Sequence, residues 1–134
     1  MKNFIVCMAV IPLLILFMLQ IAMDQKNNEI TEIIQSMTYA AKEDAKQAGG
    51  FTPEIKQKLI CDIHEKTGIE TNKIEVTADQ IQKYRYSIGD NRLIHYRIEV
   101  EIEGIMAGNK FYGIRDSDNR YTYVIDSYTA SEKV

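Results

Sequence analysis

The stretch FIVCMAVIPLLILFMLQIAM, residues 4–23, is apolar almost throughout and decides how the rest of the chain is placed. It contains no charged residue, and Gln20 is its only clearly polar side chain. A helix rises about 1.5 Å per residue, so a run of this length spans about 30 Å, the thickness of a bilayer's hydrocarbon core. We therefore expect a transmembrane segment over residues 1–23. Its candidate membrane and assembly residues are Pro12, Leu13, Leu14, Phe17 and Ile21.

A signal peptide that is cut away is the alternative interpretation of this run. The apolar core of a signal peptide has about 7–15 residues and ends in a small-x-small cleavage site. This run is longer, and Ala22 is the only small residue at its end, which favours retention of the helix. Lys2 and the α-amino group favour a cytoplasmic N-terminus, so we expect a single-pass protein of the cell membrane with residues 24–134 outside the cytoplasm.

Composition limits the other functions. The chain has 134 residues and a net charge of −3, which is room for one membrane segment and one small domain. No basic patch stands out, so nucleic acid is not an expected partner. Cys7 lies in the apolar run and Cys61 in the soluble part, which argues against a disulfide between them. We expect Cys61 to be a small buried side chain.

Two helices are predicted after the apolar run. Apolar residues recur with a period of 3.6 over residues 24–48, and Gly49-Gly50 ends this pattern, so one helix continues from the membrane to residue 48. Pro12 is expected to favour a kink in it. The apolar stripe consists of Ile30, Ile33, Ile34, Met37, Ala40, Ala41, Ala45 and Ala48. A second helix is predicted over residues 52–67, with Thr52 as N-cap and Gly68 as the stop.

Beyond Gly68 the apolar period changes to two, which is typical of strands. The cleanest alternation places Ile94, Tyr96, Ile98, Val100 and Ile102 on one face. Shorter patterns at 72–79, 83–88, 110–114 and 120–125 add further strands. The predicted fold is therefore α+β: a long N-terminal helix, a short second helix, and a pilin-like antiparallel sheet of four to five strands over residues 72–128.

The sequence offers no candidate catalytic, cofactor-binding or metal-binding residues, so we expect a protein that is not an enzyme and has no cofactor. Glu99, Glu101 and Glu103 share one strand face, which favours a solvated surface over a carboxylate site. The stretch DSDN, residues 116–119, is rich in oxygen ligands but lacks the glycine and glutamate of a calcium loop.

Small and aromatic residues provide a candidate contact surface. Tyrosine offers contact area at little entropic cost, although ordinary strand propensity also explains the late tyrosines. Small helix residues permit close approach of a neighbour, which is either another protein or this chain's own sheet. The candidate contact residues are Ala41, Ala45, Tyr112, Tyr121 and Tyr123.

The order of these features resembles type IV pilins and pseudopilins, and within them the TadE-like proteins of tight-adherence (Tad) pilus and secretion machinery, especially short forms from Gram-positive bacteria. The resemblance is carried by AVIPLLILFML (residues 9–19), YAAKEDAKQAGG (39–50) and EVEIEGIMAGNKFYGI (99–114). Asn3 stands where a prepilin has Gly or Ala before the apolar run, and no acidic residue occurs before Asp24. The resemblance therefore implies an accessory or minor component, not the main filament subunit.

This resemblance implies partners in the lipid bilayer and among other pilin-like or Tad-system membrane proteins. The protein would act by helix packing in the membrane and by domain contacts outside it. The alternative is a membrane-anchored extracytoplasmic domain that binds or senses a ligand. A secreted enzyme with an uncut leader is the least supported interpretation, because no catalytic constellation is present.

Overall fold

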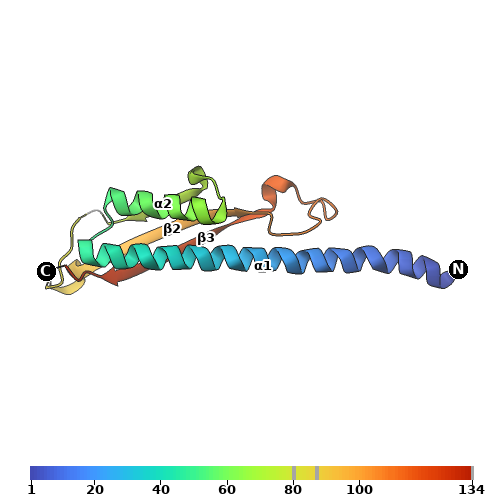
Figure 1. The fold of residues 1–134 in the computed structure, drawn as a ribbon, viewed down its shortest axis with the longest axis horizontal. Helices are drawn as coiled ribbons and strands as arrows, with labels where there is room; N and C mark the ends of the chain where they lie inside the picture. Colours follow the sequence, from blue (N-terminus) through green and yellow to red (C-terminus); the bar gives the residue numbers. More distant parts are fainter. Residues whose placement is uncertain (80, 87, 134) are drawn as a thin grey trace. The chain divides into compact units, whose positions relative to one another are not determined.

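The computed structural model describes residues 1–79, 81–86 and 88–133, without the side chains of residues 90 and 91. Figure 1 shows an α+β fold with one long helix, a second helix and a sheet. The helices are α1 (Lys2–Ala48) and α2 (Pro53–Thr67), and the strands are β1 (Ile74–Ala78), β2 (Leu93–Glu103) and β3 (Arg120–Ala130). Short 3-10 turns are η1 (Thr71–Lys73), η2 (Gly89–Arg92) and η3 (Asp116–Asp118).

The chain divides into two compact units. The first consists of Met1–Glu29 and Ile102–Tyr121, and the second of Ile30–Glu101 and Thr122–Val134. The first unit thus combines the N-terminal half of α1 with the connection between β2 and β3. We call residues 104–119 the β2–β3 loop.

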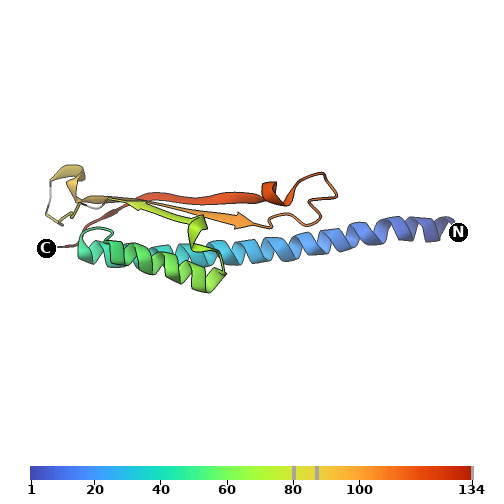
Figure 2. The same ribbon diagram turned by 90° about the horizontal axis from the view of Figure 1, so that it is seen from above.

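The second unit has two layers. Within it, α2 and the Ile30–Ala48 part of α1 lie side by side on one face of the sheet (Figure 2). Strand order is β1-β2-β3, and β1 pairs antiparallel with β2, with Ile74 opposite Val100 and Ala78 opposite Tyr96. The helices contribute the buried Ile34, Ala41, Ala45, Leu59 and Ile63 to the core between the layers.

The central strand behaves as its sequence predicts. Ile94, Ile98 and Val100 are fully buried, and Tyr96 and Ile102 are at most 6% exposed. Tyr96 packs against the buried ring of Phe51, at 5.4 Å between ring centroids. A strand with strict alternation can bury only one face, and here that face meets the helices.

The buried stripe of α1 differs in detail from the predicted one. Ile34, Thr38, Ala41 and Ala45 are buried, whereas Ala40 is exposed. These buried positions follow i, i+4, i+7 and i+11, which is one helix face. Thr38 therefore occupies a core position that its polarity did not suggest.

The second helix is present, and its ends follow ordinary capping chemistry. The Thr52 hydroxyl accepts a hydrogen bond from the Ile55 amide at 3.3 Å, and Gly68 caps the C-terminus with φ of +76°. The prediction that Cys61 is buried is wrong, because the thiol is exposed. Leu59 and Ile63 form the buried face of α2, and Cys61, midway between them, therefore points to the opposite side of the helix.

The prediction of four to five strands is not confirmed, because three strands form among the described residues. The predicted strand at 110–114 is a series of turns, since Gly108 and Gly113 take positive φ values of +66° and +76°. In the predicted strand at 83–88, the described residues 83–86 and 88 form no strand, and Ser87 lies outside the described residues. There the Lys83 amide donates to the Gly49 carbonyl instead.

Candidate functional site

By length and composition, the N-terminal half of α1 could cross a membrane, and none of its most apolar stretch is buried within the protein. The predicted membrane residues Leu13, Leu14, Phe17 and Ile21 are 46–67% exposed, and Pro12 is exposed as well. The helix continues through Pro12 without interruption. Such a large apolar surface is unfavourable in water, so it is compatible with single-pass anchoring in a membrane.

Gln20, the polar residue of the apolar run, holds the β2–β3 loop. Its Oε1 accepts a hydrogen bond from the Ala107 amide at 2.8 Å, and its Nε2 donates to the Ile105 carbonyl at 3.2 Å. Nε2 also donates to Asp24 Oδ1, at 2.9 Å, one turn further along the helix. One side-chain amide thus pairs with two backbone groups that lie more than 80 positions away in the sequence.

Asn119 fixes the same part of the loop from its other end. Its side chain, in a residue 7% exposed, accepts from the Met106 amide at 2.9 Å and donates to the Met106 carbonyl at 3.0 Å. Its own carbonyl accepts from the Gly104 amide at 2.8 Å. Gln20 and Asn119 therefore hydrogen-bond to backbone groups of residues 104–107, through their side-chain amides and the backbone carbonyl of Asn119. The sequence showed Gln20 as an exception in an apolar run, whereas Asn119 stood out only as part of the oxygen-rich DSDN stretch.

The acidic residues of the DSDN stretch are paired within the first unit. Asp116 accepts from Asn109 Nδ2 at 2.8 Å and lies 3.4 Å from Lys110 Nζ, and Asp118 lies 3.1 Å from Arg115 Nε. The hydrogen bond from Asn109, followed by the hydrogen bond and charge of Lys110, lowers the pKa of Asp116. Among the described residues, no group of three or more His, Cys, Asp or Glu could hold a metal ion.

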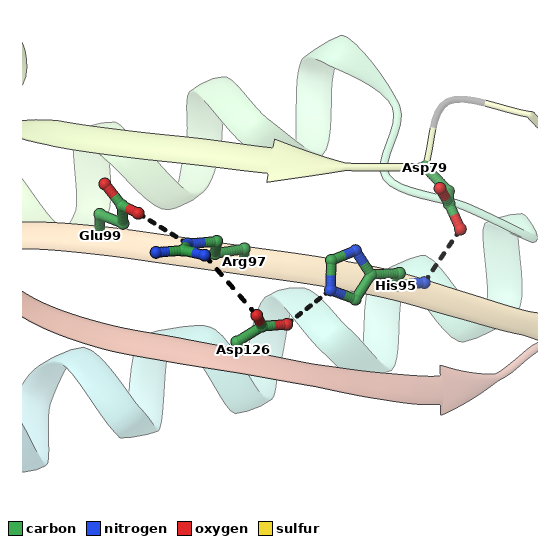
Figure 3. Close-up of polar contacts among 5 residues, drawn as sticks. All are labelled: Asp79, His95, Arg97, Glu99 and Asp126. Carbon is green, nitrogen blue, oxygen red and sulfur yellow. Dashed lines mark hydrogen bonds and ion pairs between the residues drawn. The ribbon is translucent and has the colours of Figure 1, made fainter.

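A polar cluster lies on the outer face of the sheet in the second unit (Figure 3). His95 Nε2 lies 2.5 Å from Asp126 Oδ1, and Arg97 bridges Asp126 at 3.8 Å and Glu99 at 2.6 Å. The Asp79 carboxylate accepts from the His95 amide at 3.1 Å. The side chains of the ion pairs are 32–46% exposed; they are those of His95, Arg97, Glu99 and Asp126. Ion pairs at such exposure contribute about 0–1 kcal/mol each to stability. The cluster therefore links β2 to β3 as cross-strand pairs do.

A groove in the second unit runs between α1 and the edge strand β3. It has a volume of about 390 Å³, and Gln35, Thr38 and Lys42 line its helix side, with Tyr123 and Asp126 on the strand. Gln35 Nε2 donates to the Tyr123 hydroxyl at 2.6 Å. The Thr38 hydroxyl is buried and has no hydrogen-bond partner. A buried hydroxyl without a partner is unfavourable, so it marks where a ligand could add one.

The predicted contact residues are distributed over both units. Ala41 and Ala45 are 6% and 0% exposed in the core of the second unit, so this chain covers them. Tyr112 and Tyr121 belong to the first unit and are 56% and 37% exposed. Tyr123 lines the groove of the second unit. As a surface for another protein, these residues stay a prediction.

The chain was compared with protein-family models, curated proteins and solved structures, and none of the three comparisons found a match.

Proposed function

We propose that this protein is an accessory or minor pilin-like component of a Tad-type or type IV pilus-related assembly or secretion machinery. One observation carries the proposal: a single 47-residue helix has an exposed apolar first half, while its second half is part of an α+β core. That plan suits a protein that anchors in the bilayer and presents a small domain outside the cytoplasm. Its action would be helix packing and domain contacts, not catalysis.

Packing between helices in a membrane depends on dispersion contacts, because lipid offers no hydrophobic driving force for association. Leu14 and Ile21 lie seven residues apart on one face of α1 and are 54% and 46% exposed. Met8 and Ile15 have the same spacing on a different face and are 64% and 53% exposed. The two pairs therefore provide a matched test of whether one face is used for assembly.

The test replaces Leu14 and Ile21 with threonine, and Met8 and Ile15 with threonine in the control. Both double variants should remain in the membrane after a carbonate wash. Copurification with the secretion ATPase or its membrane platform should fall for the first variant and persist for the second. Equal association of the two variants would contradict packing through the Leu14–Ile21 face.

Anchoring and orientation need separate measurements, because a signal sequence near the N-terminus can also meet the length and composition required of a membrane span. We expect the mature N-terminus to precede Phe4 and the C-terminal domain to be digested by protease added to intact cells. A mature chain in the culture fluid that starts after Met23 would overturn the anchor. A domain protected in intact cells would overturn the orientation.

The second candidate function is a membrane-anchored domain that binds a ligand, and the unpartnered Thr38 hydroxyl in the groove favours it. A ligand there would supply a hydrogen-bond partner to Thr38. In that case Thr38→Val would remove binding while leaving anchoring unchanged. A gene neighbourhood with a secretion ATPase supports assembly, whereas a neighbouring kinase gene supports sensing.

A further inference from the structure

The β2–β3 loop carries its own exposed apolar side chains. Phe111 is 76% and Tyr112 is 56% exposed, and their rings meet edge to face with centroids 5.4 Å apart. Lys110 precedes them and is held at 3.4 Å from Asp116. An aromatic pair next to a charged side chain is the composition found where protein meets the headgroup level of a bilayer.

The loop lies beside the apolar run and not beyond its end. Gln20, which bonds the loop at Ile105 and Ala107, lies three residues before Met23, or about 5 Å along the helix. Leu16 lies about 10 Å before Met23, and a Cβ added to Gly108 would be 2.5 Å from its Cδ2. If residues 4–23 cross the bilayer, these contacts hold the loop at the depth of the last third of the span.

Part of the loop backbone meets a requirement of such a place, because polar groups in lipid need partners within the protein. The amides of residues 111–114 all donate to loop carbonyls, at 2.9–3.2 Å. The amides of Met106 and Ala107 donate to the side chains of Asn119 and Gln20. These six amides therefore need no water.

An open hollow of about 460 Å³ separates part of the loop from the helix within the first unit. Leu13, Leu16 and Phe17 line it from α1, and Met106, Ala107 and Tyr112 from the loop. Apart from Gln20, whose amide already has partners in the loop, these walls are largely apolar. Water gains little from such walls, whereas lipid acyl chains can fill the space between them.

We propose that the β2–β3 loop is a membrane-interface element, in which Phe111 and Tyr112 insert among the lipids of the outer leaflet and acyl chains occupy the hollow beside Leu16. This inference rests on the proposed membrane anchor, and it adds a second lipid contact to it.

The chain contains no tryptophan, so one introduced tryptophan reports on one position. The experiment uses three full-length variants in phosphatidylcholine vesicles: Phe111→Trp, Tyr86→Trp and Leu14→Trp. Tyr86 is the matched control, since it lies in a loop of the second unit and is 75% exposed, almost as much as Phe111. Leu14→Trp reports whether α1 inserts. The probe is loss of fluorescence with lipids brominated near the headgroup or near the chain end.

We expect quenching of Leu14→Trp, and quenching of Phe111→Trp that is stronger with bromine near the headgroup, while Tyr86→Trp is unaffected. If Leu14→Trp is quenched and Phe111→Trp is not, the loop proposal is overturned and the proposed anchor stands. Absence of quenching in Leu14→Trp would overturn the anchor itself. Acrylamide in the aqueous phase quenches an exposed tryptophan. If the Phe111→Trp fluorescence is protected from acrylamide only when the vesicles carry the protein at high density, a protein partner covers the loop and the lipid contact is overturned.

Discussion

Replacing Gln20 with leucine should release the β2–β3 loop while keeping the helix in the membrane. Leucine has a similar size but removes the acceptor of the Ala107 amide and the donor to the Ile105 carbonyl. Ala107 is 8% exposed, so its amide would be left buried without a partner. Such a loss costs about 1–3 kcal/mol. The apolar run becomes more apolar by the same change, so insertion should not suffer.

The measurement is amide hydrogen exchange of the full-length protein in vesicles or micelles. Local opening of the loop should become roughly 5- to 100-fold more frequent, because each 1.4 kcal/mol changes an equilibrium about tenfold. The increase should be confined to residues near 105–107, and the amides of α2 should be unchanged. Gln25→Leu is the matched control, since Gln25 is an exposed glutamine on the same helix.

Unchanged exchange at Ala107 in Gln20→Leu would refute the reasoning, because the amide would then have another partner or be open already. An equal increase in Gln25→Leu would also refute it, since the effect would come from helix polarity in general. Either outcome would leave the proposed membrane anchoring untouched, because that proposal depends on the length and polarity of residues 4–23.

Three further predictions address other parts of the molecule. Gly108→Ala and Gly113→Ala both place alanine at positive φ, at a cost of about 1–2 kcal/mol each. Of the two glycines, only Gly108 faces the helix. Gly108→Ala should therefore make the loop more sensitive to protease than Gly113→Ala does. The hydrogen bond from Asn109 is the first cause that lowers the pKa of Asp116 below its ordinary 3.8. The contribution of this one carboxylate to loop stability is therefore present above pH 3.8 and should be lost as pH falls through the lowered pKa. Asp116→Asn should remove this pH dependence from the hydrogen exchange of the loop amides. Thr38→Val removes a buried hydroxyl without a partner and should raise the free energy of unfolding by about 1 kcal/mol, measured by denaturant titration.

Periodicity predicted the parts of the fold that depend on local burial. The continuous helix to Ala48, the second helix and the buried face of β2 all follow from apolar spacing, and the structure has them. A stripe or an alternating row needs only one partner surface, so its pattern is visible without knowing that surface.

The loop could not be predicted in this way. Its conformation depends on three positive-φ glycines, Gly104, Gly108 and Gly113, and on side-chain amides that bond across 13 and 87 positions in the sequence. The sequence predicts a strand over residues 110–114, but the positive φ of Gly108 and Gly113 and the hydrogen bond from Asn109 Nδ2 to the Ile114 carbonyl fold this stretch into turns. Long-range polar pairs leave no periodic signal, so the candidate site appeared in the sequence only as the isolated Gln20.

Gln20 also divides the surface of the apolar run into two faces. Leu13, Phe17 and Gln20 follow i, i+4 and i+7, so they share the helix face that lines the hollow beside the loop. Leu14 and Ile21 lie about a quarter turn away from that face, because successive residues are separated by about 100°. A neighbouring helix could approach Leu14 and Ile21 without displacing the loop. Leu13 and Phe17 therefore lie on the side of the helix that faces the protein's own loop, and Leu14 and Ile21 are the face that the proposed assembly would use.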